Sequence, residues 1–260
     1  MEQFTVDRVR VCVFADKSQL GEAAAADATR ILGEALARQG SARIIIGTGN
    51  SQLEVMASLT AQPDVPWNTI EMFHMDEYVG LPADHPASFR RWLREHVADR
   101  VHPGKVHYVG GDASDADEEC RRYASLLSEA PIDITFFGIG ENGHIAFNEP
   151  QLADFADPAL VKRITLDERS RRQQVGEGHY PSLDAVPREA LTITCPVIAR
   201  SRHLIGCVPD LRKAEAVSQT LTGPIAESCP ASMVRRHPNA VLYLDSESAS
   251  LVERKRHASS

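Results

Sequence analysis

Short apolar runs alternate with longer stretches of helical periodicity along most of this 260-residue chain. Runs rich in Val, Ile and Phe, with few polar residues between them, are typical of strands in a sheet that is covered on both faces. We expect strands at Val9–Phe14, Arg43–Ile46, Ile70–Met75, Ile132–Phe137, Arg163–Leu166, Ala190–Thr194, His203–Val208 and Val241–Leu244.

Helical patterns occupy most of the segments between these strands. Residues Ser18–Gln39 place small and branched apolar side chains on one face, and Gly40 then predicts a helix end. Further helices are expected at Ser51–Ala61, Pro86–Val97, Asp117–Leu127 and Leu211–Leu221. Regular β–α alternation with right-handed crossovers predicts an α/β fold, with a doubly wound, mainly parallel sheet and helices on both faces.

No internal repeat, low-complexity tract or linker interrupts this pattern. We therefore expect a single domain over residues 1–252, followed by a polar C-terminal tail at residues 253–260. A hydrophobic content of 43% is enough to give such a domain a substantial core.

Charge and cysteine usage exclude several classes of partner. The formal net charge of −8 argues against broad nucleic-acid binding, although local amides and cations can still hold one small anion. No apolar run approaches the roughly 20 residues that span a bilayer, and Met1–Asp7 does not resemble a secretory signal. The five cysteines are scattered without a C-x-x-C pair. We expect a cytoplasmic protein with neither a nucleic-acid nor a membrane partner.

Polar motifs follow three of the expected strands, at the sheet edge where doubly wound folds bind ligands. The first is Gly47-Thr-Gly-Asn-Ser-Gln52, which opens a helix. Its glycines allow close backbone approach, and a helix start suits a phosphate, so the candidate ligands are Thr48, Gly49, Asn50 and Ser51. The motif matches neither G-x-G-x-x-G nor G-x-x-x-x-G-K-[ST], so a dinucleotide or a nucleoside triphosphate is unsupported. An ordinary N-capped turn would look the same.

The second motif contains the adjacent carboxylates Asp76 and Glu77 after an apolar strand. One of them could point into a cleft while the other faces away, because successive strand residues alternate in direction. A carboxylate in that place could move protons to and from carbon if its surroundings tune its pKa. The alternative interpretation is a surface acidic turn, which is the commoner fate of an Asp-Glu pair.

The third motif is Phe137-Gly-Ile-Gly-Glu-Asn-Gly-His-Ile-Ala-Phe-Asn-Glu-Pro150. Its glycines permit close backbone approach, and Glu149 could turn back toward His144 if the segment loops. An imidazole oriented by a carboxylate is an effective acid/base group near neutral pH. We interpret His144 as functional, although a lone His is more often structural.

Metal ligation is not indicated. The ten histidines show no H-x-x-x-H pair, and the cysteines do not cluster. His74 and Asp76 could be neighbours on one strand face, but two ligands do not define a site. We expect no metal and no other cofactor.

Taken together, these segments resemble the glucosamine-6-phosphate deaminase (glucosamine/galactosamine-6-phosphate isomerase) family, which belongs to a wider group with the 6-phosphogluconolactonases. The resemblance includes Met75-Asp-Glu-Tyr-Val-Gly-Leu-Pro82 and Val186-Pro-Arg-Glu-Ala-Leu-Thr192, and extends more loosely to His237-Pro-Asn-Ala240. Its most specific string, Gly143-His-Ile-Ala-Phe-Asn-Glu-Pro150, resembles lactonases only through the Gly-His.

The resemblance implies a Rossmann-like fold and the conversion of glucosamine 6-phosphate to fructose 6-phosphate and ammonia. It assigns the proton transfer between C2 and C1 to Asp76. It assigns opening of the sugar ring to His144, oriented by Glu149 and Asn142. Some relatives carry Asp at position 142, and an amide there cannot offset an imidazolium charge as a carboxylate does.

The same resemblance implies that the Thr48–Ser51 loop holds the phosphate together with Arg172 and Lys213. The register of these two cations is ambiguous, because other arginines stand beside them and each could be a solvated helix charge. The neighbours are Arg169, Arg171 and Arg212.

Other functions remain open at this point. A lactone hydrolase such as a 6-phosphogluconolactonase would use the same phosphate pocket, and a non-catalytic sugar-phosphate sensor could share the fold. Galactosamine 6-phosphate is an alternative substrate. Relatives occur as single chains or as assemblies, so a homo-oligomer is possible.

Overall fold

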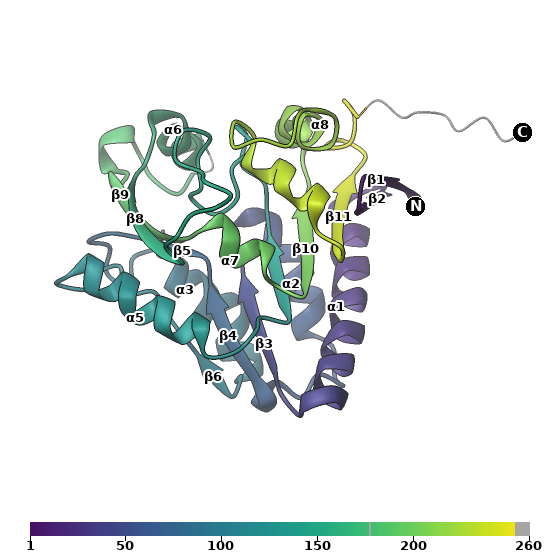
Figure 1. Cartoon of the computed structure of the whole chain (residues 1–260), viewed down its shortest axis with the longest axis horizontal. Helices are drawn as coiled ribbons and strands as arrows, with labels where there is room; N and C mark the ends of the chain where they lie inside the picture. The colour runs from purple at the N-terminus through teal and green to yellow at the C-terminus, as the bar shows by residue number, and fades with distance from the viewer. Residues whose placement is uncertain (177, 253–260) are drawn as a thin grey trace, which may run out of the picture.

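The computed structural model describes residues 1–176 and 178–252, so the predicted tail at 253–260 lies outside the described residues. Its main sheet has the strand order β1-β2-β11-β10-β7-β3-β4-β6 (Figure 1). All neighbours pair in parallel except β1 and β2. The strands are β1 Glu2–Val6, β2 Val9–Phe14, β3 Ala42–Ile46, β4 Ile70–His74, β6 Lys105–Val106, β7 Ile134–Phe137, β10 His203–Val208 and β11 Ala240–Asp245. The predicted doubly wound, mainly parallel α/β fold is confirmed.

Helices cover both faces of this sheet (Figure 1). The longest begins after Asp16, which accepts a hydrogen bond from Gln19 N, and ends at Gly40, whose φ of 75° suits glycine. The α-helices are α1 Lys17–Gln39, α2 Leu53–Thr60, α3 Phe89–Leu93, α4 Asp99–Val101, α5 Ala116–Ser128, α6 Glu168–Gly176, α7 Cys195–Ala199 and α8 Ala214–Thr222. The 3-10 helices are η1 Asn50–Gln52, η2 Trp67–Thr69, η4 Leu183–Ala185, η5 Leu211–Lys213 and η6 Pro230–Arg236, and η3 Arg94–Ala98 is a π-helix.

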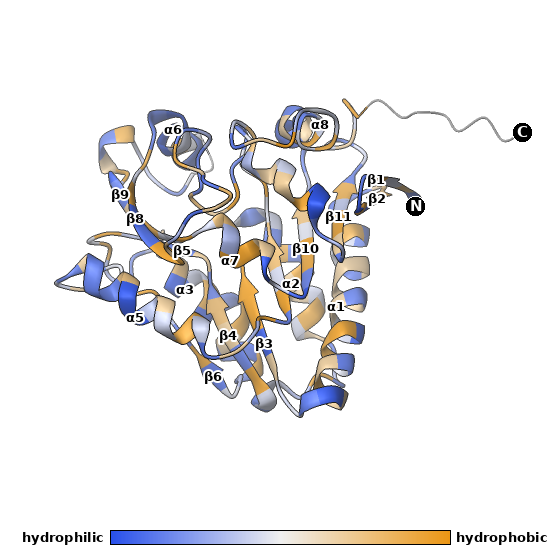
Figure 2. Cartoon of the chain, viewed as in Figure 1, coloured by the Kyte–Doolittle hydropathy of each residue, from blue (hydrophilic) through white to orange (hydrophobic). Residues whose placement is uncertain are grey.

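Successive residues of the central strands alternate between two cores. Ile44 and Ile46 of β3 face the core under α1 and α2, whereas Ile45 faces the core under α5 and α7. Figure 2 shows the carboxyl-terminal part of β3 as apolar, while polar residues lie on the outer side of α5. This double burial explains why the central strands could be predicted as continuous apolar runs.

A second, three-stranded antiparallel sheet differs from the prediction. It contains β5 Asp76–Tyr78, β9 Glu189–Ile193 and β8 Val161–Thr165. The strands expected at Arg163–Leu166 and Ala190–Thr194 therefore exist but do not join the main sheet. They enclose a separate apolar cluster that includes Tyr78, Phe89 and Phe147.

The second sheet fixes the chain just after β4. Instead of turning into a surface loop, the chain continues as β5, where Asp76 pairs with Thr192 and Tyr78 with Ala190. No helix in the described part of the chain is both long and apolar enough to cross a bilayer.

Candidate active site

A cavity opens at the carboxyl ends of β3 and β7, which are neighbours in the sheet but far apart in the chain. The chain proceeds from β3 to β4 and β6 on one side, and from β7 to β10 and β11 on the other. Doubly wound sheets bind ligands at such a reversal. The cavity has a volume of about 760 Å³ when the open solvent at its mouth is included. Predicted site residues in its walls are Thr48, Gly49, Asn50, Ser51, Asp76, His144 and Lys213.

The Gly47–Gln52 loop lies close against the strand end of β7. A Cβ on Gly47 would stand 2.9 Å from Phe136 O, and Gly49 has a φ of 132°, which favours glycine. Thr48 Oγ1 is buried and has no hydrogen-bond partner among the described residues. A buried hydroxyl without a partner is costly, so this oxygen is suited to bind a ligand atom.

Asp76 faces the cavity from the start of β5 and is 6% exposed. Burial raises the pKa of its carboxyl well above the ordinary value, and the neighbouring charge of Glu77 raises it further. A carboxylate with a raised pKa is a stronger base, so Asp76 is suited to accept a proton from carbon.

Glu77 is fully buried and faces away from the cavity, so the surface-turn interpretation of this pair is wrong. It accepts hydrogen bonds from Ser88 Oγ at 2.6 Å and from Arg90 N at 3.0 Å. The Arg90 guanidinium also lies 3.3 Å from the same oxygen. Glu77 therefore holds the start of α3, while its neighbour serves the cavity.

His144 lies on a tight loop whose glycines make room for its ring. A Cβ on Gly140 would stand 2.2 Å from His144 Cε1, so only glycine fits there. His144 Nδ1 lies 3.3 Å from Glu149 Oε1, a close electrostatic contact without the alignment of a hydrogen bond. Asn142 Nδ2 donates to Glu149 Oε2 at 2.5 Å. The loop thus brings His144, Glu149 and Asn142 together as predicted.

Glu149 is fully buried yet has a depressed pKa. Burial alone would raise its pKa, but the charge of His144 and hydrogen bonds from neighbouring side chains outweigh burial and lower it to about 2. Glu149 is therefore ionised at neutral pH and stabilises a positive charge on the imidazole.

Ser170 of α6 completes this group, and the sequence analysis missed it. Its Oγ donates a hydrogen bond to Glu149 Oε1. Asp167 caps the helix by accepting from Ser170 N at 2.6 Å, which turns Ser170 inward. The cap is readable in the sequence, but nothing in it indicates the contact with Glu149. From the same segment, Gln173, Gln174 and His179 also line the cavity.

The structure corrects one of the two predicted cations. Lys213 lines the cavity, and Arg212 lines it too. Arg172 does not: it is exposed on α6, where its guanidinium bonds to Glu168. Residues two apart face different sides of a helix, so the turn that buries Ser170 sends Arg172 outward.

The other arginines of that stretch have partners outside the cavity. Arg169 donates to Glu141 O at 3.2 Å, and Arg171 donates to Leu183 O at 2.6 Å. Among the described residues, one acidic group has the spacing of possible metal ligands, namely Asp210, Asp245 and Glu247. Exposed acidic groups are common without an ion, and the absence of a metal stays a prediction.

Comparison with known proteins places this chain in a defined family. The family model of glucosamine-6-phosphate isomerases and 6-phosphogluconolactonases matches residues 15–243. The chain therefore belongs to this family.

Within the family, relatives named glucosamine-6-phosphate deaminase are similar in sequence. The protein from Shouchella clausii (strain KSM-K16) is 30% identical over 214 residues, covering 81% of this chain and 85% of the relative. The protein from Bacillus cereus (strain B4264) is 35% identical over 207 residues, covering 79% and 76%.

Solved structures show the same fold. A structure described as a monomeric glucosamine-6-phosphate deaminase has a TM-score of 0.84 and 30% identity, covering 93% of this chain and 99% of its own. A 6-phosphogluconolactonase from Shewanella baltica OS155 has a TM-score of 0.76 at 20% identity, covering 93% and 100%. At that identity the second likeness concerns the fold alone.

Proposed function

We propose that this protein is an enzyme that converts glucosamine 6-phosphate and water into fructose 6-phosphate and ammonia, without a cofactor. Relatives with 30–35% identity over about four-fifths of the chain carry the deaminase name. The observation that carries the proposal is that one cavity contains a buried carboxyl group with a raised pKa, Asp76, and a histidine, His144, that contacts an ionised carboxylate, Glu149. Asp76 and His144 both line this cavity, and Glu149 Oε1 lies 3.3 Å from His144 Nδ1.

The phosphate would bind at the Thr48–Ser51 loop. Thr48 Oγ1 lacks a partner among the described residues and could donate a hydrogen bond to it. Backbone amides at the start of η1, from Gly49 to Ser51, would add further donors. Lys213 and Arg212 would supply positive charge from the end of β10.

The chemistry would begin with His144, which protonates the ring oxygen and opens the sugar. Asp76 would then take the C2 proton, leaving an enolamine between C1 and C2, and return a proton to C1. This transfer leaves an imine at C2. Addition of water and loss of ammonia give the ketone of fructose 6-phosphate.

A cytoplasmic location and the state of assembly are part of this proposal. The scattered, buried cysteines suit a cytoplasmic location, and the sugar-phosphate ligand is the one expected partner. A homo-oligomer is compatible with the sequence, while the solved deaminase compared above is described as monomeric.

The test is an ammonia-release assay on purified protein with glucosamine 6-phosphate, galactosamine 6-phosphate and N-acetylglucosamine 6-phosphate. Hydrolysis of 6-phosphogluconolactone is followed in parallel. We expect ammonia and fructose 6-phosphate from the first substrate, and none from the acetylated sugar, whose nitrogen is an amide. Lactone hydrolysis without ammonia release would replace the proposed function with the lactonase alternative.

A further inference from the structure

Asp210 has an unusual backbone conformation at the edge of the cavity. It follows β10 with a φ of 81° and a ψ of 141°, a backbone conformation that residues other than glycine rarely adopt. Asp210 is one of the residues that line the cavity. Residues held in such conformations persist only where their surroundings enforce them, and they cluster at functional sites.

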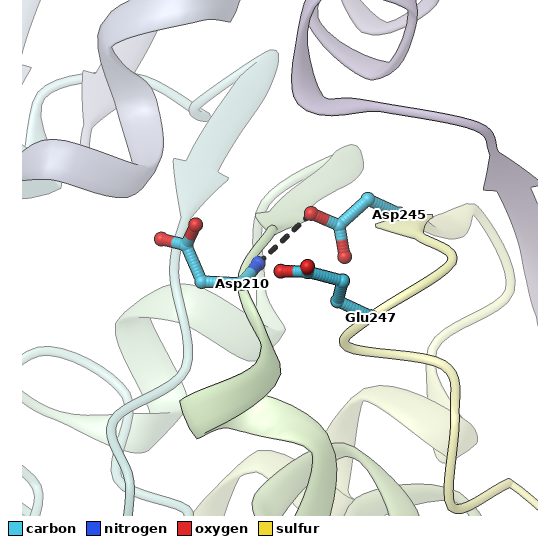
Figure 3. A group of neighbouring side chains, drawn as sticks. All are labelled: Asp210, Asp245 and Glu247. Atoms are coloured by element: carbon cyan, nitrogen blue, oxygen red, sulfur yellow. Dashed lines mark hydrogen bonds between the residues drawn. The ribbon is translucent and has the colours of Figure 1, made fainter.

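Asp245 holds this conformation. Its Oδ2 accepts a hydrogen bond from Asp210 N at 2.9 Å, as the dashed line in Figure 3 shows. Its Oδ1 accepts from Ser248 N at 2.7 Å, while Asp245 N donates to Ser248 Oγ at 3.2 Å. Asp245 is 5% exposed at the end of β11, beside β10. Both carboxylate oxygens are therefore used, and the carboxylate is fixed in place.

The strained residue starts the turn that carries the two cations of the cavity. Asp210 O accepts from Lys213 N at 3.0 Å, which closes the first turn of η5. Arg212 and Lys213 of that turn both line the cavity. The backbone at Asp210 therefore shapes the turn from which these two side chains extend, and the Asp210 carboxylate also lies 3.9 Å from Arg212 Nη2.

We propose that Asp245 is a positioning residue for substrate binding: by holding Asp210 N, it sets the η5 turn that directs Arg212 and Lys213 toward the anionic end of the substrate. This inference rests on the proposed role of that cavity wall in binding phosphate. The proposal predicts the opposite of a purely electrostatic effect, because the charge of a buried carboxylate near a phosphate site should weaken binding of the anion.

The two explanations predict opposite signs for Asp245→Ala. Positioning predicts a rise in KM for glucosamine 6-phosphate of about tenfold, with kcat within about threefold of wild type, since a lost hydrogen bond to a charged group is worth about that factor. Loss of charge alone predicts a lower KM. Glu247→Gln is the matched control, because it removes a neighbouring acidic charge that makes no hydrogen bond to Asp210 among the described residues.

Two further variants separate positioning from folding. Asp245→Asn keeps one carbonyl oxygen that can accept from Asp210 N, although its amide group can no longer accept from Ser248 N as well. It should therefore restore part of the affinity that Asp245→Ala loses. Asp210→Gly permits the conformation without a restraint, but it also removes the carboxylate whose Oδ2 lies 3.9 Å from Arg212 Nη2. The KM of Asp210→Gly itself is therefore the reference for the double variant. The rise in KM from Asp210→Gly to Asp210→Gly/Asp245→Ala should be smaller than the rise from wild type to Asp245→Ala. Equal losses in both backgrounds, or an unchanged KM in Asp245→Ala with a wild-type thermal midpoint, would overturn the proposal.

Calorimetric titration with fructose 6-phosphate and with inorganic phosphate makes this test independent of turnover. If wild type binds fructose 6-phosphate but releases no ammonia, the proposed function fails while weaker binding by Asp245→Ala still supports positioning. If wild type releases ammonia and all Asp245 variants bind fructose 6-phosphate as wild type does, the positioning role fails alone.

Discussion

The two buried carboxylates that serve the cavity, Asp76 and Glu149, have opposite surroundings. Asp76 sits where β4 passes into β5, and burial first, then the charge of Glu77, raises its pKa. Glu149 accepts hydrogen bonds from Asn142 and Ser170 and faces His144, and these contacts outweigh burial and lower its pKa to about 2. Two groups of the same chemistry are thus tuned in opposite directions within one site.

These opposite pKa shifts explain how one cavity can perform both acid and base chemistry. Environments that push the pKa values of two groups apart assign them different roles. A carboxylate with a raised pKa is a good proton acceptor, whereas a permanently ionised one supports a cation beside it. We therefore assign the transfer of the carbon-bound proton to Asp76, and the stabilisation of the His144 imidazolium to Glu149.

Asp76→Asn should have the largest effect. An amide cannot accept the carbon-bound proton, so ammonia release should fall by a factor on the order of 10²–10⁴. Steady-state kinetics with glucosamine 6-phosphate measure the loss. Asp117→Asn, in the first turn of α5 and outside the cavity, is the control. Turnover near wild type in Asp76→Asn would remove this residue from the mechanism.

Glu149→Gln should reduce turnover on the order of 10²-fold, because the imidazole of His144 loses its charged partner. Stability should change as well. Glu149 has a folded pKa of about 2 against an ordinary value of 4.5, so its contribution is present above pH 4.5 and is lost as the pH falls toward 2. Denaturant unfolding of wild type and variant should therefore differ at pH 7 and converge in acid. A difference that persists unchanged at acid pH would contradict this assignment.

Ser170→Ala should reduce kcat by about tenfold, since one hydrogen bond to a buried charge is worth about that factor. Ser170→Thr keeps the hydroxyl and should restore most of the activity. Glu168→Gln tests whether any change on the outer face of α6 has the same effect, and it should not. If Ser170→Thr is as impaired as Ser170→Ala, the hydroxyl is not what matters.

The smallest expected effect is on the stability of Asp76→Asn. Because burial raises the folded pKa of Asp76, its ionised form opposes folding. The folded protein binds more protons than the unfolded one. The contribution of Asp76 to the free energy of unfolding is therefore fully present below the pKa of the unfolded state and is lost as the pH rises through the pKa of the folded state. The variant should melt at a higher temperature than wild type at pH 7, with the gain shrinking in acid. A lower melting temperature at pH 7 would show that Asp76 is stabilised as an anion.

Much of the fold could be predicted, because burial on both faces leaves a plain signal. The strands Val9–Phe14 and His203–Val208 match β2 and β10 in both bounds. The sheet to which β8 and β9 belong could not be predicted, since the sequence of a short strand does not indicate which strand it pairs with. Their place in the second sheet depends on tertiary packing around Tyr78 and Phe147.

The site was predictable where a motif stays within one loop. Asn142, His144 and Glu149 lie on one tight turn, so their sequence spacing carries their geometry. Ser170 contacts Glu149, and Asp245 contacts Asp210, from distant segments of the chain, and no local pattern reveals such contacts. The prediction for Arg172 depended on which face of a short helix each residue of a basic run occupies. The sequence does not determine that.

In the proposed mechanism, Asp76 moves the carbon-bound proton, while His144 opens the sugar ring with the support of Glu149. Hydrogen exchange at C1 of fructose 6-phosphate, in deuterium oxide containing ammonium, tests this most directly, because the ketose can enter the reaction in its open form. We expect Asp76→Asn to lose this exchange. His144→Gln should keep measurable exchange while it loses ammonia release from cyclic glucosamine 6-phosphate. Equal losses of exchange in the two variants would contradict the division of roles.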